Sequence, residues 1–172
     1  MRKIILSGYM GSGKSTIANL LHKLTGIQTI DLDKYIEQKS NLSISEIFKQ
    51  KGEVLFRKLE HEALKELIDS QQEFILSLGG GTPCYSNNLG LLESADIMTI
   101  YLKASIATLC QRLAAGIAER PLLAGKSAGE MREFIAKHLF ERNPYYNQAR
   151  HIIETDNKTP PQVADEILKI LA

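Results

Sequence analysis

The chain has 172 residues, 44% of them hydrophobic, which is enough to bury a substantial core, and we expect a single domain over residues 1–172. Its 21 Lys and Arg residues against 20 Asp and Glu residues give a formal net charge of +1, which argues against a protein that binds nucleic acid or a membrane surface. No apolar run approaches the length of a membrane span, and two cysteines without a metal-ligand spacing favour a reducing compartment. We therefore expect a cytoplasmic protein, which we take to be a monomer.

A glycine-rich stretch near the start of the chain, Gly8 to Ser15, matches the P-loop pattern G-x-x-x-x-G-K-[ST]. The apolar run 3–7 before it predicts a buried parallel strand, and apolar residues recur at helical spacing from Lys14 to Leu24 after it. In such a loop, backbone N–H groups and the helix N-terminus surround phosphate oxygens. The pattern predicts a nucleoside triphosphate, with Lys14 at its β- and γ-phosphates and Ser15 on Mg²⁺. A glycine-rich turn that binds nothing is the alternative.

Two aspartates, Asp31 and Asp33, follow the next predicted strand. We expect this strand to end near Asp31 and a helix to begin near Asp33 or Lys34. If the backbone is still extended there, both carboxylates point to the same side, at the C-terminal edge of the sheet where α/β proteins bind ligands. The alternative is ordinary helix capping, for which Asp is a favoured residue.

The next stretch carries a pair of opposite charges. Ser43 and Glu46 form the pattern of a capping box, which predicts a short helix that ends at Gly52 and is followed by an amphipathic helix of about 16 residues. Arg57 and Glu60 are three positions apart on the second helix, so they can pair on one face. From the pattern alone, a solvated surface pair is the more ordinary interpretation.

Three consecutive glycines, Gly79, Gly80 and Gly81, follow a predicted strand over residues 73–78. Glycines at the end of a buried strand indicate either positive φ angles or a close approach of the backbone to a ligand. A plain flexible loop is the alternative.

Helices and strands continue to alternate along the rest of the chain. The expected elements are a helix over 87–93, a strand over 97–102, a helix over 105–113, a helix from 128 to about 142 that Pro144 interrupts, a strand over 151–154 and a helix that Pro160 opens. The stretch of about 113–127 is rich in small residues and typical of a mobile lid, with a long surface connection as the alternative.

This alternation predicts an α/β fold with three layers, in which helices cover both faces of a parallel sheet of about five strands. The P-loop, the aspartate pair, the Arg57 helix and the triple glycine all fall at or just beyond C-terminal strand ends, so they can meet at one cleft. The natural interpretation is a small enzyme of phosphoryl transfer, in which positioning and charge stabilisation carry most of the catalysis.

The motifs together resemble the shikimate kinase family, in order and across almost the whole chain. The P-loop alone is shared by very many proteins, whereas the arginine–glutamate motif and the triple glycine at this separation are much more specific. The residues that carry the resemblance are Gly8-x-x-Gly11-Ser12-Gly13-Lys14-Ser15-Thr16, Asp31-Leu32-Asp33, Phe56-Arg57-x-x-Glu60, Leu78-Gly79-Gly80-Gly81, Arg120-Pro121-Leu122-Leu123 and Arg142-x-x-Tyr145.

The resemblance implies a P-loop kinase fold like that of nucleoside monophosphate kinases, with an acceptor-binding region at about 33–60. It implies transfer of the γ-phosphate of ATP to the 3-hydroxyl of shikimate, with Mg²⁺, in chorismate and aromatic amino-acid synthesis. The implied contacts with ATP are Gly11, Ser12, Gly13, Lys14, Ser15, Thr16, Arg112, Arg120, Asn157 and Lys158, of which Arg112 and the turn at Asn157 fall where the family holds adenine. The implied contacts with shikimate are Asp33, Arg57, Gly79, Gly80, Gly81 and Arg142. Mg²⁺ is assigned to Ser15 and, through water, to Asp31, and catalysis to Lys14, Asp33 and Arg120.

Two other functions remain open at this point. A gluconate-type sugar-acid kinase shares the P-loop and an anionic polyol acceptor, although it is not expected to carry both specific motifs. A P-loop switch would hydrolyse nucleotide slowly without any acceptor, and the second anion pocket argues against it.

Overall fold

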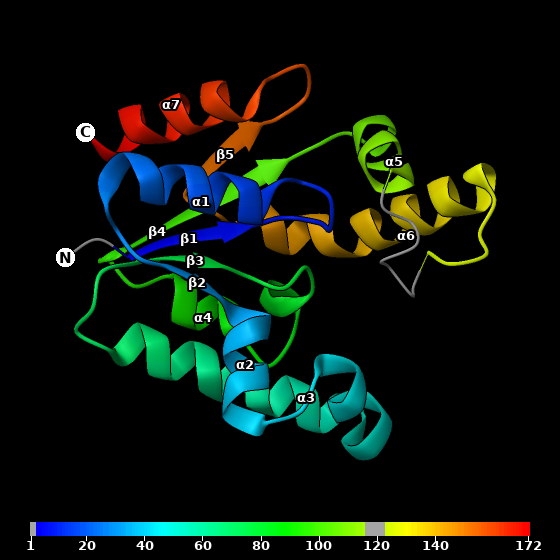
Figure 1. Ribbon diagram of the computed structural model, residues 1–172, viewed down its shortest axis with the longest axis horizontal. Helices are drawn as coiled ribbons and strands as arrows, with labels where there is room; N and C mark the ends of the chain where they lie inside the picture. The colour runs from blue at the N-terminus through cyan, green and yellow to red at the C-terminus, as the bar shows by residue number, and fades with distance from the viewer. Residues whose placement is uncertain (1–2, 116–122) are drawn as a thin grey trace.

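Five parallel strands form one sheet in the structure, a computed structural model that describes residues 3–115 and 123–172. The strand order is β2-β3-β1-β4-β5, with helices on both faces, so the predicted three-layer α/β fold is confirmed (Figure 1). The strands are β1 (Lys3–Ser7), β2 (Thr29–Asp31), β3 (Phe74–Ser77), β4 (Ile97–Lys103) and β5 (His151–Glu154). The helices are α1 (Lys14–Thr25), α2 (Leu32–Ser40), α3 (Ile44–Asp69), α4 (Asn88–Leu92), α5 (Ile106–Ala114), α6 (Ala128–Tyr146) and α7 (Pro160–Leu171), with a 3₁₀ turn η1 (Thr82–Cys84).

Successive residues of β1 face two separate cores. Ile4 and Leu6 pack with side chains of α1 and α7, whereas Ile5 packs with side chains of α2, α3 and α4. None of these three side chains has exposed surface. Because helices cover both faces of the sheet, β1 consists of consecutive apolar residues instead of an alternation of apolar and polar ones.

The position of β1 brings two glycine-rich loops together. β1 lies between β3 and β4, and its parallel register with β3 pairs Leu6 with Ser77. Just beyond, the Leu78 N–H donates a hydrogen bond to the Leu6 carbonyl at 3.0 Å. The loops after β1 and β3 therefore leave the sheet side by side. The chain connections diverge on either side of β1, and open α/β sheets bind ligands at such a point.

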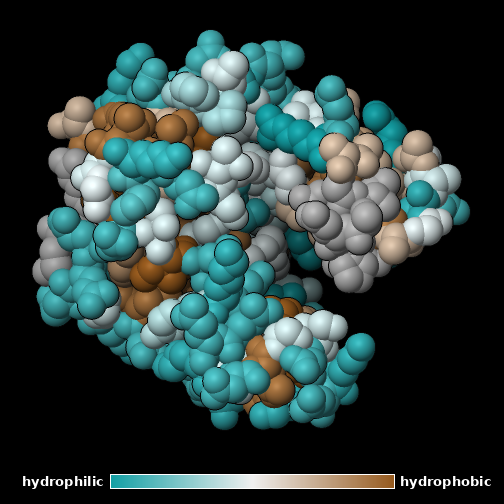
Figure 2. All heavy atoms as spheres, viewed as in Figure 1, coloured by the Kyte–Doolittle hydropathy of each residue, from teal (hydrophilic) through white to brown (hydrophobic). Residues whose placement is uncertain are grey.

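A third core includes Tyr9, Tyr101 of β4 and apolar residues of α5 and α6. These two helices lie near the C-terminal ends of the strands (Figure 1). Leu123, which is fully buried, joins this core. The surface is indented between the α5–α6 part and the part formed by α2 and α3 (Figure 2). Residues 116–122 are outside the described ranges, so most of the predicted lid at about 113–127, and Arg120 with it, stays a prediction.

The start of α2 differs from the sequence prediction. This helix begins at Leu32, because the Asp31 carboxylate caps it by accepting a hydrogen bond from the Lys34 N–H at 3.1 Å. Asp33 therefore lies in the first helical turn. The extended backbone ends at Asp31, so the condition under which both carboxylates would point to the same side is not met.

The predicted interruption of α6 at Pro144 was also wrong, since the helix continues to Tyr146. A proline removes the N–H that would otherwise bond to the carbonyl of Phe140, four residues earlier. Both residues are exposed, and 84% of Phe140 is accessible, so water can reach that carbonyl. Within the described ranges, neither α6 nor any other helix is long and apolar enough to cross a membrane.

Gly52 divides α3 into two helical segments at the predicted position. Its φ of 78° and ψ of 172° belong to a region of backbone conformation that is essentially restricted to glycine. The predicted capping box begins the first segment, since the Glu46 N–H donates to Ser43 Oγ at 3.2 Å and Glu46 Oε2 accepts from the Ser43 N–H at 2.8 Å. The second segment carries Arg57 and Glu60, so the bend at Gly52 sets the direction from which they approach the sheet.

We expect Gly52→Ala to lower the free energy of unfolding by roughly 1–3 kcal/mol, because alanine is strained in this backbone conformation. Steric overlap is not the cause, since a Cβ at Gly52 would have no atom within 4 Å. Gly129→Ala is the matched control: its Cβ also meets nothing within 4 Å, but its backbone is helical, so this change should raise the free energy of unfolding by about 0.5–1 kcal/mol. Urea denaturation measures both changes, and a neutral Gly52→Ala would contradict the backbone argument.

Candidate active site

The loop between β1 and α1 depends on the backbone freedom of glycine. Gly8 has a φ of 148°, and a Cβ there would lie 2.6 Å from Ser12 Oγ and 2.8 Å from the Leu102 carbonyl. Gly13, the N-cap of α1, has a φ of 98° and gives the helix no side-chain cap. The first turn of α1, all of it described, contains no acidic residue. The N–H groups of this turn and the positive end of the helix dipole are therefore left for an anion.

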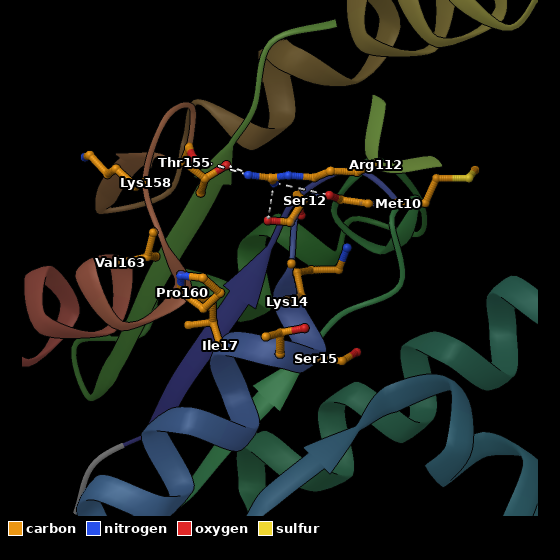
Figure 3. Close-up of a pocket in the computed structure, with 13 residues that line it drawn as sticks. Met10, Ser12, Lys14, Ser15, Ile17, Arg112, Thr155, Lys158, Pro160 and Val163 are labelled. Carbon is orange, nitrogen blue, oxygen red and sulfur yellow. Dashed lines mark hydrogen bonds between the residues drawn. The ribbon is translucent and has the colours of Figure 1, made fainter. Parts of the chain in front are cut away.

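A pocket of about 560 Å³ lies over this loop and reaches the start of α7 (Figure 3). The Arg112 guanidinium of α5 crosses it, donating to the carbonyls of Gly11 at 3.3 Å and Ser12 at 3.4 Å and to Thr155 Oγ1 at 3.2 Å. A pocket of this volume suits a ligand of nucleotide size. It is lined by Met10, Gly11, Ser12, Gly13, Lys14, Ser15, Thr16, Ile17, Arg112, Thr155, Lys158, Pro160 and Val163.

Eight of the ten residues assigned to ATP thus line one pocket. Asn157 has a φ of 57° in the turn before Lys158, and among the described residues it is not part of the pocket wall. Arg120 lies outside the described residues. Thr155, which sequence reasoning missed, holds Arg112 through both its hydroxyl and its carbonyl, the latter at 3.2 Å. No motif marks Thr155, because its contact with Arg112 joins two distant parts of the chain.

Lys14 is held by the loop that contains it. Its ammonium donates to the carbonyls of Gly8 at 2.7 Å and Tyr9 at 3.1 Å. Burial lowers the pKa of Lys14 to about 8, against the opposite effect of the Asp33 and Asp31 carboxylates. The loop therefore holds the ammonium, and the two carboxylates help to keep it charged over most of the physiological pH range.

Asp33 lies against the triple glycine. A Cβ at Gly79 would be 3.2 Å from Asp33 Oδ1, 3.5 Å from Glu60 Oε1 and 3.0 Å from Thr82 Oγ1. Burial raises the pKa of Asp33 to about 6, and the charges of Asp31 and Glu60 act in the same direction, while Lys14 opposes them. The pKa of Asp33 is thus closer to neutral pH than that of an ordinary carboxylate, and shifted groups of this kind are common in active sites.

Arg57 and Glu60 form a pair that is not solvated. Arg57 Nη1 donates to Glu60 Oε2 at 2.9 Å, and only 1% of Glu60 is exposed, so the interpretation as a surface ion pair was wrong. The Arg57 guanidinium also lies 3.9 Å from the ring centroid of Tyr85 and 5.0 Å from that of Phe56. A salt bridge and two aromatic rings therefore fix its position.

The triple glycine is explained by neighbouring side chains. None of Gly79, Gly80 and Gly81, all of which are described, has a positive φ, so that part of the prediction was wrong. A Cβ at Gly81 would lie 2.9 Å from Arg57 Nη2, and one at Gly80 would lie 3.2 Å from Arg142 Nη1. The absent side chains leave room for two guanidinium groups at the end of β3.

Tyr146 links α6 to this loop and was missed by sequence reasoning. Its hydroxyl donates to the Gly80 carbonyl, and only 1% of the residue is exposed. The resemblance had pointed to Tyr145, which is an exposed neighbour. The available signal was the spacing of four residues between Arg142 and Tyr146, which places both on one face of α6.

Metal binding depends on few protein groups here. Within residues 3–115 and 123–172, no group of three or more His, Cys, Asp and Glu side chains could hold a metal ion. Mg²⁺ in phosphoryl-transfer sites is commonly bound by one or two protein groups together with substrate phosphates and water. Ser15 in the first turn of α1 and Asp31 at the start of α2 are compatible with that kind of site, although Asp31 already caps α2.

Comparisons with known proteins by sequence and by structure point to one family. The sequence model of shikimate kinases matches residues 10–172. A shikimate kinase of Flavobacterium johnsoniae is 56% identical over 172 residues, which is 100% of both chains. The crystal structure of shikimate kinase from Bacteroides thetaiotaomicron has a TM-score of 0.91 and 32% identity, covering 99% of this chain and 98% of that one. Shikimate kinase from Acinetobacter baumannii in complex with shikimate has a TM-score of 0.87 and 31% identity, covering 99% and 93%.

A gluconokinase from Sinorhizobium meliloti has a TM-score of 0.62 over 98% of this chain and 90% of that one, but its identity is 14%, so it shares the fold alone. The family model, in contrast, matches nearly the whole chain, and the Flavobacterium johnsoniae relative matches all of it at high identity. This chain therefore belongs to the shikimate kinase family.

Proposed function

We propose that the protein is a shikimate kinase, which transfers the γ-phosphate of ATP to the 3-hydroxyl of shikimate in aromatic amino-acid synthesis. The observation that carries the proposal is the placement of the Arg57 and Arg142 guanidinium groups against Gly81 and Gly80, next to the P-loop. A kinase acting on a neutral acceptor has no need for two cations at that point. A small hydroxylated carboxylate needs them, because guanidinium groups bind carboxylates with paired, charge-assisted hydrogen bonds.

The P-loop side of the site suits the triphosphate of ATP. The N-terminus of α1 is not capped by a side chain, and among the described residues the buried Ser12 Oγ has no hydrogen-bond partner. Phosphate oxygens would satisfy both. Lys14 would lie at the β- and γ-phosphates. Ser15, and Asp31 through water, would hold Mg²⁺, whose chemistry there is to neutralise charge on the transferring phosphoryl group.

Asp33 is the group proposed to accept a hydrogen bond from the attacking hydroxyl. It lies beside Gly79 together with the Glu60 carboxylate, and the charge of Lys14 favours its ionised form. With a pKa of about 6 it is mostly ionised at neutral pH, as a hydrogen-bond acceptor must be. Positioning the hydroxyl is its main task, because phosphoryl transfer proceeds through a loose transition state that requires little early proton removal.

The remaining assignments are extensions of this proposal. The chain is proposed to act as one kinase domain over residues 1–172, a cytoplasmic monomer whose partners are small molecules. Arg120 is proposed to bring positive charge to the transferring phosphoryl group. Arg112, on α5, and Lys158, in the turn before α7, both line the pocket and are proposed to contact the adenine end of ATP.

The activity itself is tested by ADP release. With Mg²⁺ and ATP present, the rate should rise strongly when shikimate is added and should stay near the basal rate with gluconate. The reason is that the arginine pair and the triple glycine belong to the acceptor motifs of shikimate kinases. Equal rates with both acids would favour a sugar-acid kinase, and a rate independent of either acid would favour a nucleotide-hydrolysing switch.

Arg57→Ala is expected to reduce kcat/KM for shikimate on the order of ten- to a hundredfold, because a charge-assisted hydrogen bond contributes roughly 1.5–3 kcal/mol. The KM for ATP should change little, since Arg57 is absent from the wall of the nucleotide pocket within the described residues. Lys58→Ala, which removes an exposed charge from the adjacent position, is the control. If the Arg57 variant weakens ATP and shikimate equally, Arg57 does not serve the acceptor.

Asp33→Asn should raise the stability of the protein at neutral pH and lower its activity. Because the pKa of Asp33 is raised in the folded state, the native protein binds more protons than the unfolded chain between about pH 4 and 6, and the ionised carboxylate costs stability above that window. At about pH 7.5 the variant should therefore gain roughly 1–3 kcal/mol in free energy of unfolding, and at about pH 4 it should gain almost nothing. Its kcat should fall on the order of 10²–10⁴-fold.

Denaturation at both pH values and kcat at saturating Mg²⁺ measure these effects. Asp165→Asn, which changes an exposed carboxylate of α7, is the control and should give the same small effect at both pH values. An Asp33 variant that loses stability at neutral pH would show that its carboxylate is stabilised, not strained, by its surroundings.

A further inference from the structure

A chain of buried hydrogen bonds continues behind the Arg57–Glu60 pair. One oxygen of Glu60 accepts from Arg57 Nη1 at 2.9 Å, and the other, Oε1, accepts from the Thr82 hydroxyl at 2.7 Å. Thr82 has no exposed surface, and 1% of Glu60 is exposed. Thr82 is the first residue of η1, directly after the triple glycine. The two Glu60 oxygens therefore connect an acceptor-site arginine on α3 to the loop that follows β3.

Thr82 is itself held from both sides. Its N–H donates to the Gly79 carbonyl at 3.1 Å, and its carbonyl accepts from Asn88 Nδ2 at 2.8 Å. Asn88, which is fully buried at the start of α4, is in turn paired through Oδ1 with His61 Nδ1 at 2.7 Å. His61 is on α3, directly after Glu60. The hydrogen bonds from Glu60 to Thr82, from Thr82 to Asn88 and from Asn88 to His61 therefore close a ring through the α3 backbone, which fixes the Thr82 hydroxyl in one position.

We infer that Thr82 is a positioning residue for the acceptor site, which orients the Arg57 guanidinium by holding the far oxygen of Glu60. This inference rests on the proposed function, in which Arg57 binds the acceptor carboxylate. A buried carboxylate oxygen without a donor is costly. Without the Thr82 hydroxyl, Glu60 would rotate toward other donors or toward water, and Arg57 would lose the fixed anion opposite Nη1.

The surroundings of Arg57 make this orientation sensitive to Glu60. The second ion-pair partner, Glu53 Oε1, is 3.5 Å from Arg57 Nε, and 55% of the Glu53 side chain is exposed, so it holds the guanidinium weakly. The Tyr85 and Phe56 rings contact the guanidinium with their centroids 3.9 and 5.0 Å away, but a contact with a ring does not set the direction of individual N–H groups. Glu60 is therefore the contact that sets the direction of the Arg57 N–H groups, and Thr82 sets Glu60.

Three variants test the inference. Thr82→Val removes the hydroxyl with nearly unchanged volume, and Thr82→Ser keeps the hydroxyl. Thr99→Val is the matched control, because Thr99 is also buried, at 5% exposure, and its Oγ1 accepts a hydrogen bond at 2.9 Å, but from the Arg150 N–H in another part of the fold. All three should fold, and Thr82→Val and Thr99→Val should lose similar stability.

Steady-state kinetics should then distinguish positioning from stability. We expect Thr82→Val to lower kcat/KM for shikimate about tenfold, with KM for ATP unchanged, and Thr82→Ser to restore it to within about twofold. Thr99→Val should leave both constants unchanged. Combining Thr82→Val with Glu60→Gln should cost little more than Glu60→Gln alone, because the two residues act in series. Equal losses for shikimate and ATP in Thr82→Val, or additive losses in the double variant, would overturn the inference.

An NMR measurement tests the orientation of Arg57 without any acceptor substrate. Arg57 Nε is buried, so its N–H group should give a resolved signal in a ¹H–¹⁵N spectrum, which Arg57→Lys assigns by its disappearance. This signal should shift or broaden in Thr82→Val and persist in Thr82→Ser and Thr99→Val. An unchanged signal in Thr82→Val overturns the positioning role. If shikimate does not stimulate the wild-type enzyme, the proposed function fails, while this signal still decides whether Thr82 orients Arg57.

Discussion

The parallel pairing of β1 with β3 is the constraint on which the site depends. It places the end of the P-loop strand beside the end of the strand that carries the triple glycine, with Leu78 bonded to Leu6 across the junction. A phosphate-binding loop and an acceptor-binding loop thus emerge next to each other from two strands that are buried along their whole length. Positioning is most of what a phosphoryl-transfer enzyme must supply, and a sheet edge supplies it more accurately than loops alone.

Charge balance is the second requirement, and it is satisfied locally. Three carboxylates, those of Asp31, Asp33 and Glu60, lie among the cations of Lys14, Arg57 and Arg142. The balance is imperfect at Asp33, whose raised pKa shows that its ionised form is unfavourable in the folded protein. The fold accepts that cost at the point where a hydroxyl must be oriented, in the way that active sites commonly trade stability for function.

Sequence reasoning recovered the features that depend on local spacing. The P-loop, the capping box at Ser43 and the glycine bend at Gly52 are each defined within a few residues, and each is present. The burial of Glu60 was not predictable, because its partner Thr82 is 22 positions away and is held in turn by Asn88, six positions farther on. The reason for the triple glycine was missed for the same cause: the arginines that occupy the space come from α3 and α6.

The contacts of Lys14 lower the entropic cost of nucleotide binding. A lysine on a surface samples many rotamers, and immobilising it on binding costs entropy. Here the ammonium is tethered to the Gly8 and Tyr9 carbonyls of its own loop, so that ordering is completed during folding. The nucleotide meets a charge that is already in place, and the thermodynamic signature of its binding should carry little penalty from this side chain. The loop is preorganised, and the stability of the sheet beneath it maintains that order.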